Sequence, residues 1–298
     1  MYRRDRMEGA RWRMAYMRKH RFELLLIFIF IIFIGILDYP FLSQLYNRYV
    51  QGQVALDAIQ NAEGAQEREL REALQKARDY NSALASKGVS LEDAFAQRKK
   101  VSAAYESCLN LAGDGIMGVV EIPRLKVSIP VYHGTSEEVL QEGAGHLEGS
   151  SLPVGGTDTH ACVSAHRGLP SKELFTNLDE MKEGDVFYFR VLGKTLAYQV
   201  FRTETVLPHQ TEALSIREGE DLATLITCTP YGINTHRMYV QGKRIPYHEA
   251  EPPAIPAEPK VWIREYWWIP VNVLLLGWLV FLLRRSRRNK KNRSSENG

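Results

Sequence analysis

The segment from Thr224 to Arg237 combines residue types and spacings that suit nucleophilic chemistry. An apolar run ends at Cys228, and Pro230 and Gly232 then force the chain to turn. Arg237 opens the next apolar run nine residues after the cysteine, so its fixed charge can return beside the thiol. A cysteine at the end of a strand can act as a nucleophile, and an arginine beside it can donate hydrogen bonds to a developing oxyanion.

The base for such a thiol must come from elsewhere, because arginine stays protonated and His236 would point to the opposite strand face from Arg237. His166 is one candidate, since it follows an apolar run and precedes a Gly-Leu-Pro turn. His160 is its rival, and Cys162 lies on the same nominal strand face, so alternation alone does not choose. A metal cluster of His160, Cys162 and His166 is a third interpretation, disfavoured because no acidic ligands or second cysteine pair accompany them.

Two apolar blocks, residues 22–42 and 266–283, are each long enough to cross a bilayer as a helix. Residues 1–21 hold eight basic against two acidic side chains, and residues 284–298 hold seven against one, although the whole chain is only +3. Basic flanks stay in the cytoplasm, so the sequence predicts a two-pass protein of the cell membrane with both tails cytoplasmic and residues 43–265 outside. The position of the basic tails beside apolar spans is better explained by membrane topology than by nucleic-acid binding. For the apolar blocks themselves, two buried core helices are the weaker alternative.

No small-residue cleavage site follows the first apolar block, which favours an uncleaved anchor. Outside the cell, the three cysteines Cys108, Cys162 and Cys228 leave at least one thiol unpaired.

The external segment has two parts. In residues 43–112, Leu and Ala recur at spacings of three and four, which predicts helices over 51–86 and 91–111. Residues 113–248 instead carry short β-rich runs between turn signals, which predicts a closed barrel. A Pro-rich spacer, residues 249–265, leads to the second apolar block. The predicted strands are 116–122, 127–132, 160–164, 186–191, 195–206, 222–227 and 237–245.

Several motifs, in this order along the chain, resemble the sortase family of cysteine transpeptidases. The strand Thr224-Leu225-Ile226-Thr227-Cys228, a downstream Arg237 and an upstream His166 are typical of all sortases. Other segments are similar to class C, the pilin-polymerising branch: His133-Gly134-Thr135-Ser136, Gly145–Pro153, Gly168-Leu169-Pro170, and Thr227–Gly232 followed by Asn234–Arg237.

The resemblance implies an eight-stranded β-barrel that cuts a Leu-Pro-x-Thr-Gly-like (LPxTG) sorting signal of a pilin or surface protein between Thr and Gly. A thioester forms on Cys228, and a pilin lysine amine resolves it; His166 serves as acid and base, and Arg237 holds the oxyanion. Thr227, Thr229 and Asn234 are implied as substrate-binding or supporting residues. No cofactor or metal is implied.

Class C sortases carry a lid, a segment before the barrel with an Asp-Pro-aromatic motif laid over the active site. The nearest match here is Asp93-Ala94-Phe95, which lacks the proline. The sequence therefore leaves two readings for Asp93 and Phe95: a lid, or an ordinary helix whose ionic and aromatic groups face solvent and packing partners.

Other functions remain as alternatives. A housekeeping sortase that attaches surface proteins to the cell wall would use the same residues. A non-enzymatic surface scaffold would need an LPxTG motif before its apolar span, and Glu258–Trp262 stands there instead. In papain-like proteases the Cys precedes the His, whereas here His166 precedes Cys228. In L,D-transpeptidases the His and the Cys are close in sequence, whereas here they are 62 residues apart.

Overall fold

The computed structural model describes residues 2–87, 91–96, 101–247, 271–279, 281 and 285, with side chains described from residue 25 onward. The chain divides into two compact units. One consists of Met1–Leu42 with Glu258–Gly298, and the other is Ser43–Ala257.

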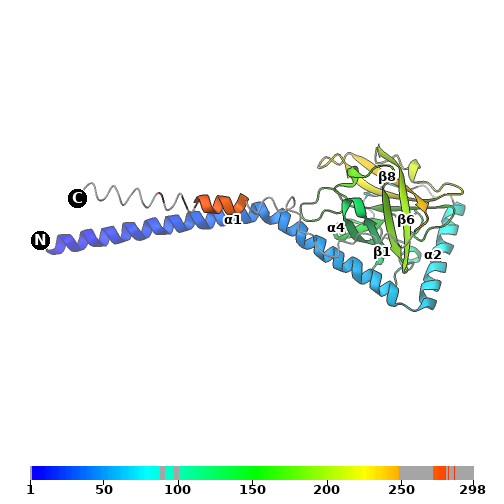
Figure 1. Ribbon diagram of the computed structural model, residues 1–298, viewed down its shortest axis with the longest axis horizontal. Helices are drawn as coiled ribbons and strands as arrows, with labels where there is room; N and C mark the ends of the chain where they lie inside the picture. Colours follow the sequence, from blue (N-terminus) through cyan, green and yellow to red (C-terminus); the bar gives the residue numbers. More distant parts are fainter. Residues whose placement is uncertain are drawn as a thin grey trace. The chain divides into compact units, whose positions relative to one another are not determined.

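The larger unit is built on a closed eight-stranded barrel with the strand order β1-β2-β3-β4-β7-β8-β6-β5 (Figure 1). Six of the eight neighbouring pairs are antiparallel, whereas β2 with β3 and β4 with β7 run parallel. Because the sheet closes on itself, each strand has a neighbour on both sides and none forms an open edge. The strands are β1 Ile116–Ile122, β2 Val127–His133, β3 Ala144–His146, β4 Thr159–Ser164, β5 Val186–Val191, β6 Lys194–Val206, β7 Asp221–Thr229 and β8 His236–Ile245.

Large apolar side chains from several strands fill the barrel. Phe187 and Phe189 of β5 and Tyr198 of β6 are almost fully buried and pack ring against ring, with centroids 5.7–5.9 Å apart. Aromatic contacts of this kind add to the free energy of burial. Aromatic side chains therefore fill much of the barrel interior.

Helix α2, Glu67–Lys87, lies against the barrel through Leu70, Leu74 and Ala77, as its apolar spacing predicts. Its buried Asn81 completes the contact, because its Nδ2 donates to the Leu152 carbonyl over 3.0 Å and its Oδ1 accepts from the Leu152 amide over 2.7 Å. Two short helices complete the unit: α3 Ala103–Glu106 and α4 Glu137–Glu142. Single 3-10 turns occur at Pro123–Leu125, Leu178–Glu180 and Glu212–Leu214.

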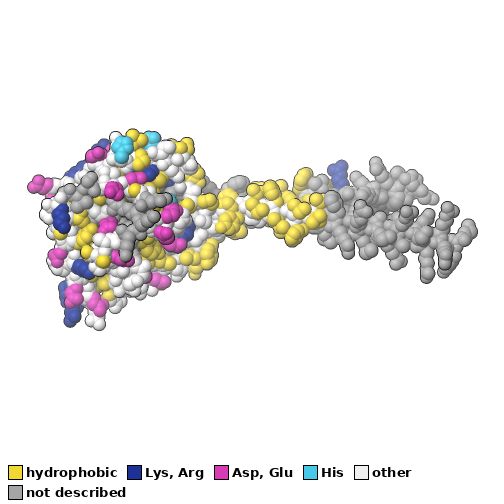
Figure 2. All heavy atoms as spheres, turned by 180° about the vertical axis from the view of Figure 1, so that it is seen from behind, with side chains coloured by type: hydrophobic (Ala, Val, Ile, Leu, Met, Phe, Trp, Pro, Cys, Tyr) yellow, Lys and Arg dark blue, Asp and Glu magenta, His cyan; other side chains and the backbone are white. Residues whose placement is uncertain are grey.

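Helix α1 runs without a break from Tyr2 to Gly64 and contains Pro40. Its part Leu25–Gly64 contains an 18-residue window with a mean hydropathy of 2.6, which is long and apolar enough to cross a membrane. Hydrophobic side chains cover the visible face of this stretch (Figure 2). The predicted first anchor, residues 22–42, falls within this helix.

Of the second predicted span, residues 271–279 are described and are helical. Asn272 in this helix donates both hydrogen bonds from Nδ2 to the Asp38 carboxylate, at 2.8 and 2.7 Å. The Pro-rich spacer 249–265 and most of the predicted tail 284–298 lie outside the described residues.

The helix predicted over 91–111 is wrong. Residues 91–96 form a turn, and only Ala103–Glu106 is helical in the described part of that stretch. The Asp93 side chain accepts a hydrogen bond from the Phe95 amide over 3.3 Å, and such local bonds compete with helix formation. The three-residue strand β3 was missed, because so short a run carries no detectable alternation.

Candidate active site

The parallel pair β4 and β7 brings a histidine and a cysteine to the same end of the barrel. Ser164 is paired with Ile226 in this ladder, and each is followed two residues later by a site residue: His166, just beyond the end of β4, and Cys228, still within β7. The antiparallel pair β7 and β8 then places Arg237 directly opposite Cys228. Directly opposed residues in a sheet share a face, so the guanidinium returns to the thiol as the sequence predicted.

Hydrogen bonds lock the histidine strand to the cysteine strand beyond the ladder. The Ala165 amide donates to the Ile226 carbonyl over 3.1 Å, and the buried Thr227 hydroxyl donates to the Ala165 carbonyl over 2.8 Å. Thr227 and Ala165, the residues that directly precede Cys228 and His166, are therefore joined by a hydrogen bond. Its contact is with the protein backbone, which fits the supporting half of the role expected for it.

Arg237 is held in place by the turn that precedes it. Its Nη1 donates to the carbonyls of Asn234 and His236, both over 3.1 Å. Asn234 has φ = 60°, a left-handed conformation that asparagine tolerates better than most residues, and this aims its carbonyl at the guanidinium. Asn234 thus acts on the site through its backbone.

Asp93 and Phe95 lie over this same arginine. The Asp93 carboxylate accepts from Arg237 Nε and Nη2, both over 2.7 Å, in a two-pronged ion pair. The Phe95 ring lies 5.0 Å from Arg237 Cζ and 5.8 Å from the His166 ring. Leu91 and Ala94 are buried against apolar groups that include Leu214, Ile226 and Tyr239. We call residues 91–96 the covering segment; it shields the end of the barrel where His166, Cys228 and Arg237 meet.

Under the covering segment the Cys228 thiol is largely withdrawn from solvent, with 7% of the residue exposed. Burial raises the pKa of Cys228, the Arg237 guanidinium lowers it, and the Asp93 carboxylate raises it further. Two of these three influences disfavour the thiolate, and Asp93 and its segment contribute to both. The closed arrangement therefore holds a cysteine of reduced reactivity.

Comparison with known proteins identifies this barrel. A sortase domain matches residues 120–245. The structure of sortase C from Streptococcus pneumoniae superposes with a TM-score of 0.60 at 46% identity, covering 65% of this chain and 97% of that one. Sortase C-1 of Actinomyces oris superposes with a TM-score of 0.58 at 40% identity, over 60% of this chain and 99% of that one. The chain belongs to the sortase family, in its class C branch.

Curated sortases of another class are more distant. Sortase A of Streptococcus agalactiae is 30% identical over 117 residues, and sortase A of Staphylococcus aureus is 32% identical over 124 residues. These alignments cover 47% and 58% of the two relatives' lengths and 38% and 40% of this chain. The chain thus spans only about half the length of these curated relatives.

The other thiols and the rival histidine of this sortase occupy ordinary core positions. Cys162 is fully buried, and burial raises its pKa to about 12; Cys108 is also buried, and burial raises its pKa. His160 contacts the Ser215 carbonyl at 2.9 Å and the Thr224 hydroxyl at 2.7 Å, and burial lowers its pKa to about 4. These contacts use both ring nitrogens of His160, whereas His166 lies two residues beyond the end of β4.

His166 has a polar partner that the sequence did not point out. Its Nε2 lies 3.3 Å from Glu137 Oε1 of α4, and the same oxygen accepts from Gln141 Nε2 over 2.6 Å. Glu137 directly follows a class C motif of the sequence, so its place beside that motif was the available signal.

Arg167 is a second residue that the sequence did not single out. Its Nη1 donates to the Thr229 hydroxyl over 3.3 Å, and it forms an ion pair with Asp179. Thr229, expected as a substrate-binding or supporting residue, therefore joins the end of β7, which carries Cys228, to the loop that carries His166. Within the described residues, no group of three or more His, Cys, Asp and Glu side chains is placed to hold a metal ion.

Proposed function

We propose that this sortase is a cysteine transpeptidase that polymerises pilins, with Cys228 as nucleophile, His166 as acid and base, and Arg237 as the oxyanion donor. The observation that carries the proposal is the register of three strands, which gathers these residues at one end of the barrel. The class C neighbours support the choice of pilins as substrates.

The first half-reaction cuts the sorting signal. The Cys228 thiolate attacks the threonine carbonyl of an LPxTG-like segment, and the negative charge that develops on the oxygen is stabilised by Arg237. The bond between Thr and Gly then breaks, and His166 donates a proton to the departing glycine amine. The product is a thioester between the pilin and Cys228.

The second half-reaction joins two subunits. A lysine amine of the next pilin attacks the thioester carbonyl, His166 accepts the amine proton, and the Cys228 sulfur leaves. An isopeptide bond replaces the peptide bond that was cut, so no net water is consumed. His166 must therefore act as an acid first and as a base second.

The covering segment fits the role of a lid. Asp93 occupies Nε and Nη2 of Arg237, which are the donors that form the open edge of the guanidinium, since Nη1 already serves two carbonyls. An oxyanion cannot use that edge until Asp93 leaves. The lid thus competes with substrate although Ala94 stands where the class C motif has proline.

We further propose a two-pass arrangement with both tails in the cytoplasm and the barrel outside. The basic residues of both tails favour it, as does the hydrogen bond from Asn272 to Asp38, which joins the two apolar segments.

The test uses the full chain in detergent micelles with a fluorescent LPxTG peptide. Mass spectrometry of the wild type should find the acyl fragment on Cys228, and Cys228→Ala should form neither thioester nor product. Cys108→Ala and Cys162→Ala are the controls and should retain both. A thioester on Cys162, or full activity of Cys228→Ala, would contradict the assignment.

The amine that the enzyme prefers as acceptor distinguishes pilus polymerisation from attachment to the cell wall. A peptide with a lysine side-chain amine should resolve the thioester into an isopeptide, whereas a wall-attaching sortase should prefer a peptide with an N-terminal amine. Rates with the two peptides at equal concentration give the comparison. A clear preference for the N-terminal amine would favour the housekeeping alternative.

A further inference from the structure

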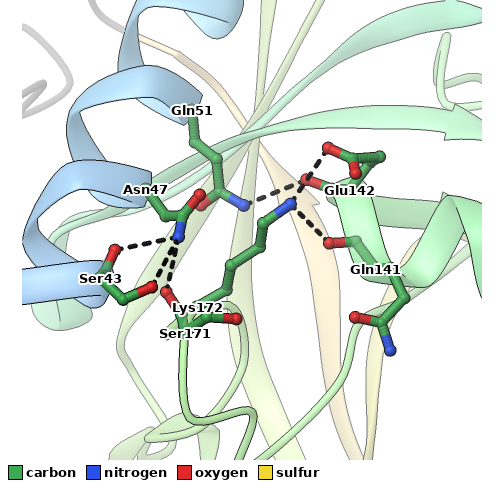
Figure 3. A network of polar contacts seen from close by, with 7 residues as sticks. All are labelled: Ser43, Asn47, Gln51, Gln141, Glu142, Ser171 and Lys172. Carbon is green, nitrogen blue, oxygen red and sulfur yellow. Dashed lines mark hydrogen bonds and ion pairs between the residues drawn. The ribbon is translucent and has the colours of Figure 1, made fainter. Parts of the chain in front are cut away.

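One face of α1 lies against the loop that follows His166. Its residues Gln44, Asn47, Arg48 and Gln51 are spaced three and four apart, so they project from one side of the helix just after the apolar segment. Figure 3 shows two of them, Asn47 and Gln51. We call these four residues the docking face.

The first half of the docking face holds the backbone of the loop. Gln44 Nε2 donates to the Pro170 carbonyl over 3.2 Å, and Asn47 Nδ2 donates to the Ser171 carbonyl over 3.0 Å. Arg48 forms an ion pair with Glu173. Three successive contacts therefore fasten a segment that begins four residues after His166.

The second half of the docking face holds α4. The Gln51 side chain donates to the Glu142 carbonyl over 3.1 Å, at a helix end whose carbonyls have no partner within the helix. Gln51 is 7% exposed, so this bond is sheltered from water. Lys172 of the loop reaches the same end, donating to the Gln141 carbonyl over 2.6 Å and to the Glu142 carboxylate over 3.0 Å (Figure 3).

The chain of contacts continues through α4 to His166. Gln141 donates from its side chain to Glu137 Oε1, and that oxygen faces His166 Nε2. A carboxylate that accepts from Nε2 fixes the ring orientation and leaves Nδ1 as the free nitrogen of the neutral imidazole. The Glu137 side chain is 65% exposed, so it depends on its neighbours to stay in position.

We propose that the docking face of α1 is a positioning surface for His166, which acts through α4 and Glu137. The inference rests on the proposed role of His166 as acid and base. Asn47 and Gln51 are positioning residues, and Glu137 is the group through which their effect reaches the imidazole.

A matched pair of double variants of the full chain, in detergent micelles, tests the proposal. Asn47→Asp with Gln51→Glu keeps the size of both side chains but removes both amide donors. Asn61→Asp with Gln53→Glu makes the same two chemical changes, and adds the same charge, at exposed positions of the same helix. Turnover of the LPxTG peptide and the melting temperature are measured for both.

The docking-face variant should lower kcat roughly tenfold, because a small misplacement of a catalytic group is costly, and should leave KM within about twofold. The control variant should match the wild type. An equal kcat in the two variants overturns the proposal, and so does a docking-face variant that melts earlier but turns over normally.

A double-mutant cycle with Glu137→Ala shows whether the effect passes through α4. Glu137→Ala alone should also lower kcat, and in that background the docking-face changes should lower it by less than about twofold further. If the reductions in kcat of the two sets of changes multiply, α1 and Glu137 act independently. That result would overturn the proposed path from α1 through α4 to His166.

Failure of this inference can be told from failure of the proposed function. If His166→Ala and Cys228→Ala abolish product while the docking-face variant behaves as its control, only the positioning role is lost. If His166→Ala remains active, the proposed catalytic role falls first, and this inference falls with it.

Discussion

At the scale of single residues, Arg237 has more partners than its neighbours in the site. Its Nη1 is committed to two backbone carbonyls, and its Nε and Nη2 form the edge that Asp93 now occupies. The proposed role of Arg237 therefore requires a planar guanidinium, with one nitrogen bonded to the turn and two nitrogens on its other edge. A lysine ammonium cannot hold the turn and present a two-pronged edge together.

Arg237→Lys should therefore lower kcat/KM by about a hundredfold, near the lower end of what an oxyanion donor contributes. Arg244→Lys, on the same strand, provides the control and should remain close to the wild type. Initial rates with the LPxTG peptide and thermal melting of both variants give the comparison. Near-normal turnover of Arg237→Lys would mean that the arginine only supports the turn.

The electrostatics of Cys228 give a second prediction at this scale. Asp93 raises the pKa of the thiol, so Asp93→Asn, which removes the charge and keeps the shape, should lower it. The midpoint of the pH profile of Cys228 alkylation should then move to lower pH, with more thiolate at neutral pH. Iodoacetamide labelling at a series of pH values, followed by mass spectrometry, measures this midpoint. An unchanged midpoint in a folded variant would contradict the assigned influence of Asp93.

At the scale of elements, the covering segment and α2 are the two parts that most depend on long-range contacts. The covering segment joins the barrel through Asp93 and Arg237, which are 144 residues apart. Helix α2 joins it through Asn81 and the backbone of Leu152.

Opening the covering segment should expose the thiol. Asp93→Ala with Phe95→Ala removes the ion pair and the ring that lies near His166, so Cys228 should be alkylated at least tenfold faster. Asp57→Ala with Phe201→Ala, two exposed positions, makes the same kinds of change elsewhere and should leave the rate unchanged. Equal rates in both well-folded variants would show that residues 91–96 do not restrict access.

Asn81 should matter for stability and not for chemistry. Asn81→Ala leaves the Leu152 amide without its partner, whereas the Leu152 carbonyl still accepts from the Val154 amide over 2.8 Å. One unsatisfied buried amide costs about 1–3 kcal/mol. The melting temperature should fall by roughly 5–10 °C for a unit of this size. The exposed Asn61→Ala is the matched control. A melting temperature equal to that of the control would mean that water replaces Asn81 at no cost.

Much of the barrel could be predicted because its strands show clear alternation and turn signals. The residues before the barrel could not be read in the same way. Local propensity favours a helix around Ala94, and the contact that prevents one comes from a strand far along the chain. Alternation along the strand likewise does not distinguish His166 from His160. The choice depends on the parallel pairing of β4 with β7, which decides which histidine reaches the end beside Cys228.

At the scale of the whole molecule, the basic tails and the two apolar blocks predict the orientation of the chain in the membrane. In a chain whose three native cysteines are replaced by alanine, a single thiol placed at Ser294→Cys in the C-terminal tail should be protected from an impermeant maleimide in intact cells and labelled after lysis. Ser215→Cys, an exposed position of the catalytic unit, should be labelled in both. Labelling of position 294 in intact cells would overturn the two-pass arrangement.

The burial of Cys228 beside Asp93 and Arg237 has a consequence beyond access to substrate. A thiolate outside the cell meets peroxides, and oxidation beyond the sulfenic acid is effectively irreversible. Because the closed site keeps this sulfur protonated and shielded, we expect the idle protein to survive hydrogen peroxide that destroys the opened variant. In the proposed lid role, the covering segment would thus protect the Cys228 sulfur from oxidation until a substrate displaces it.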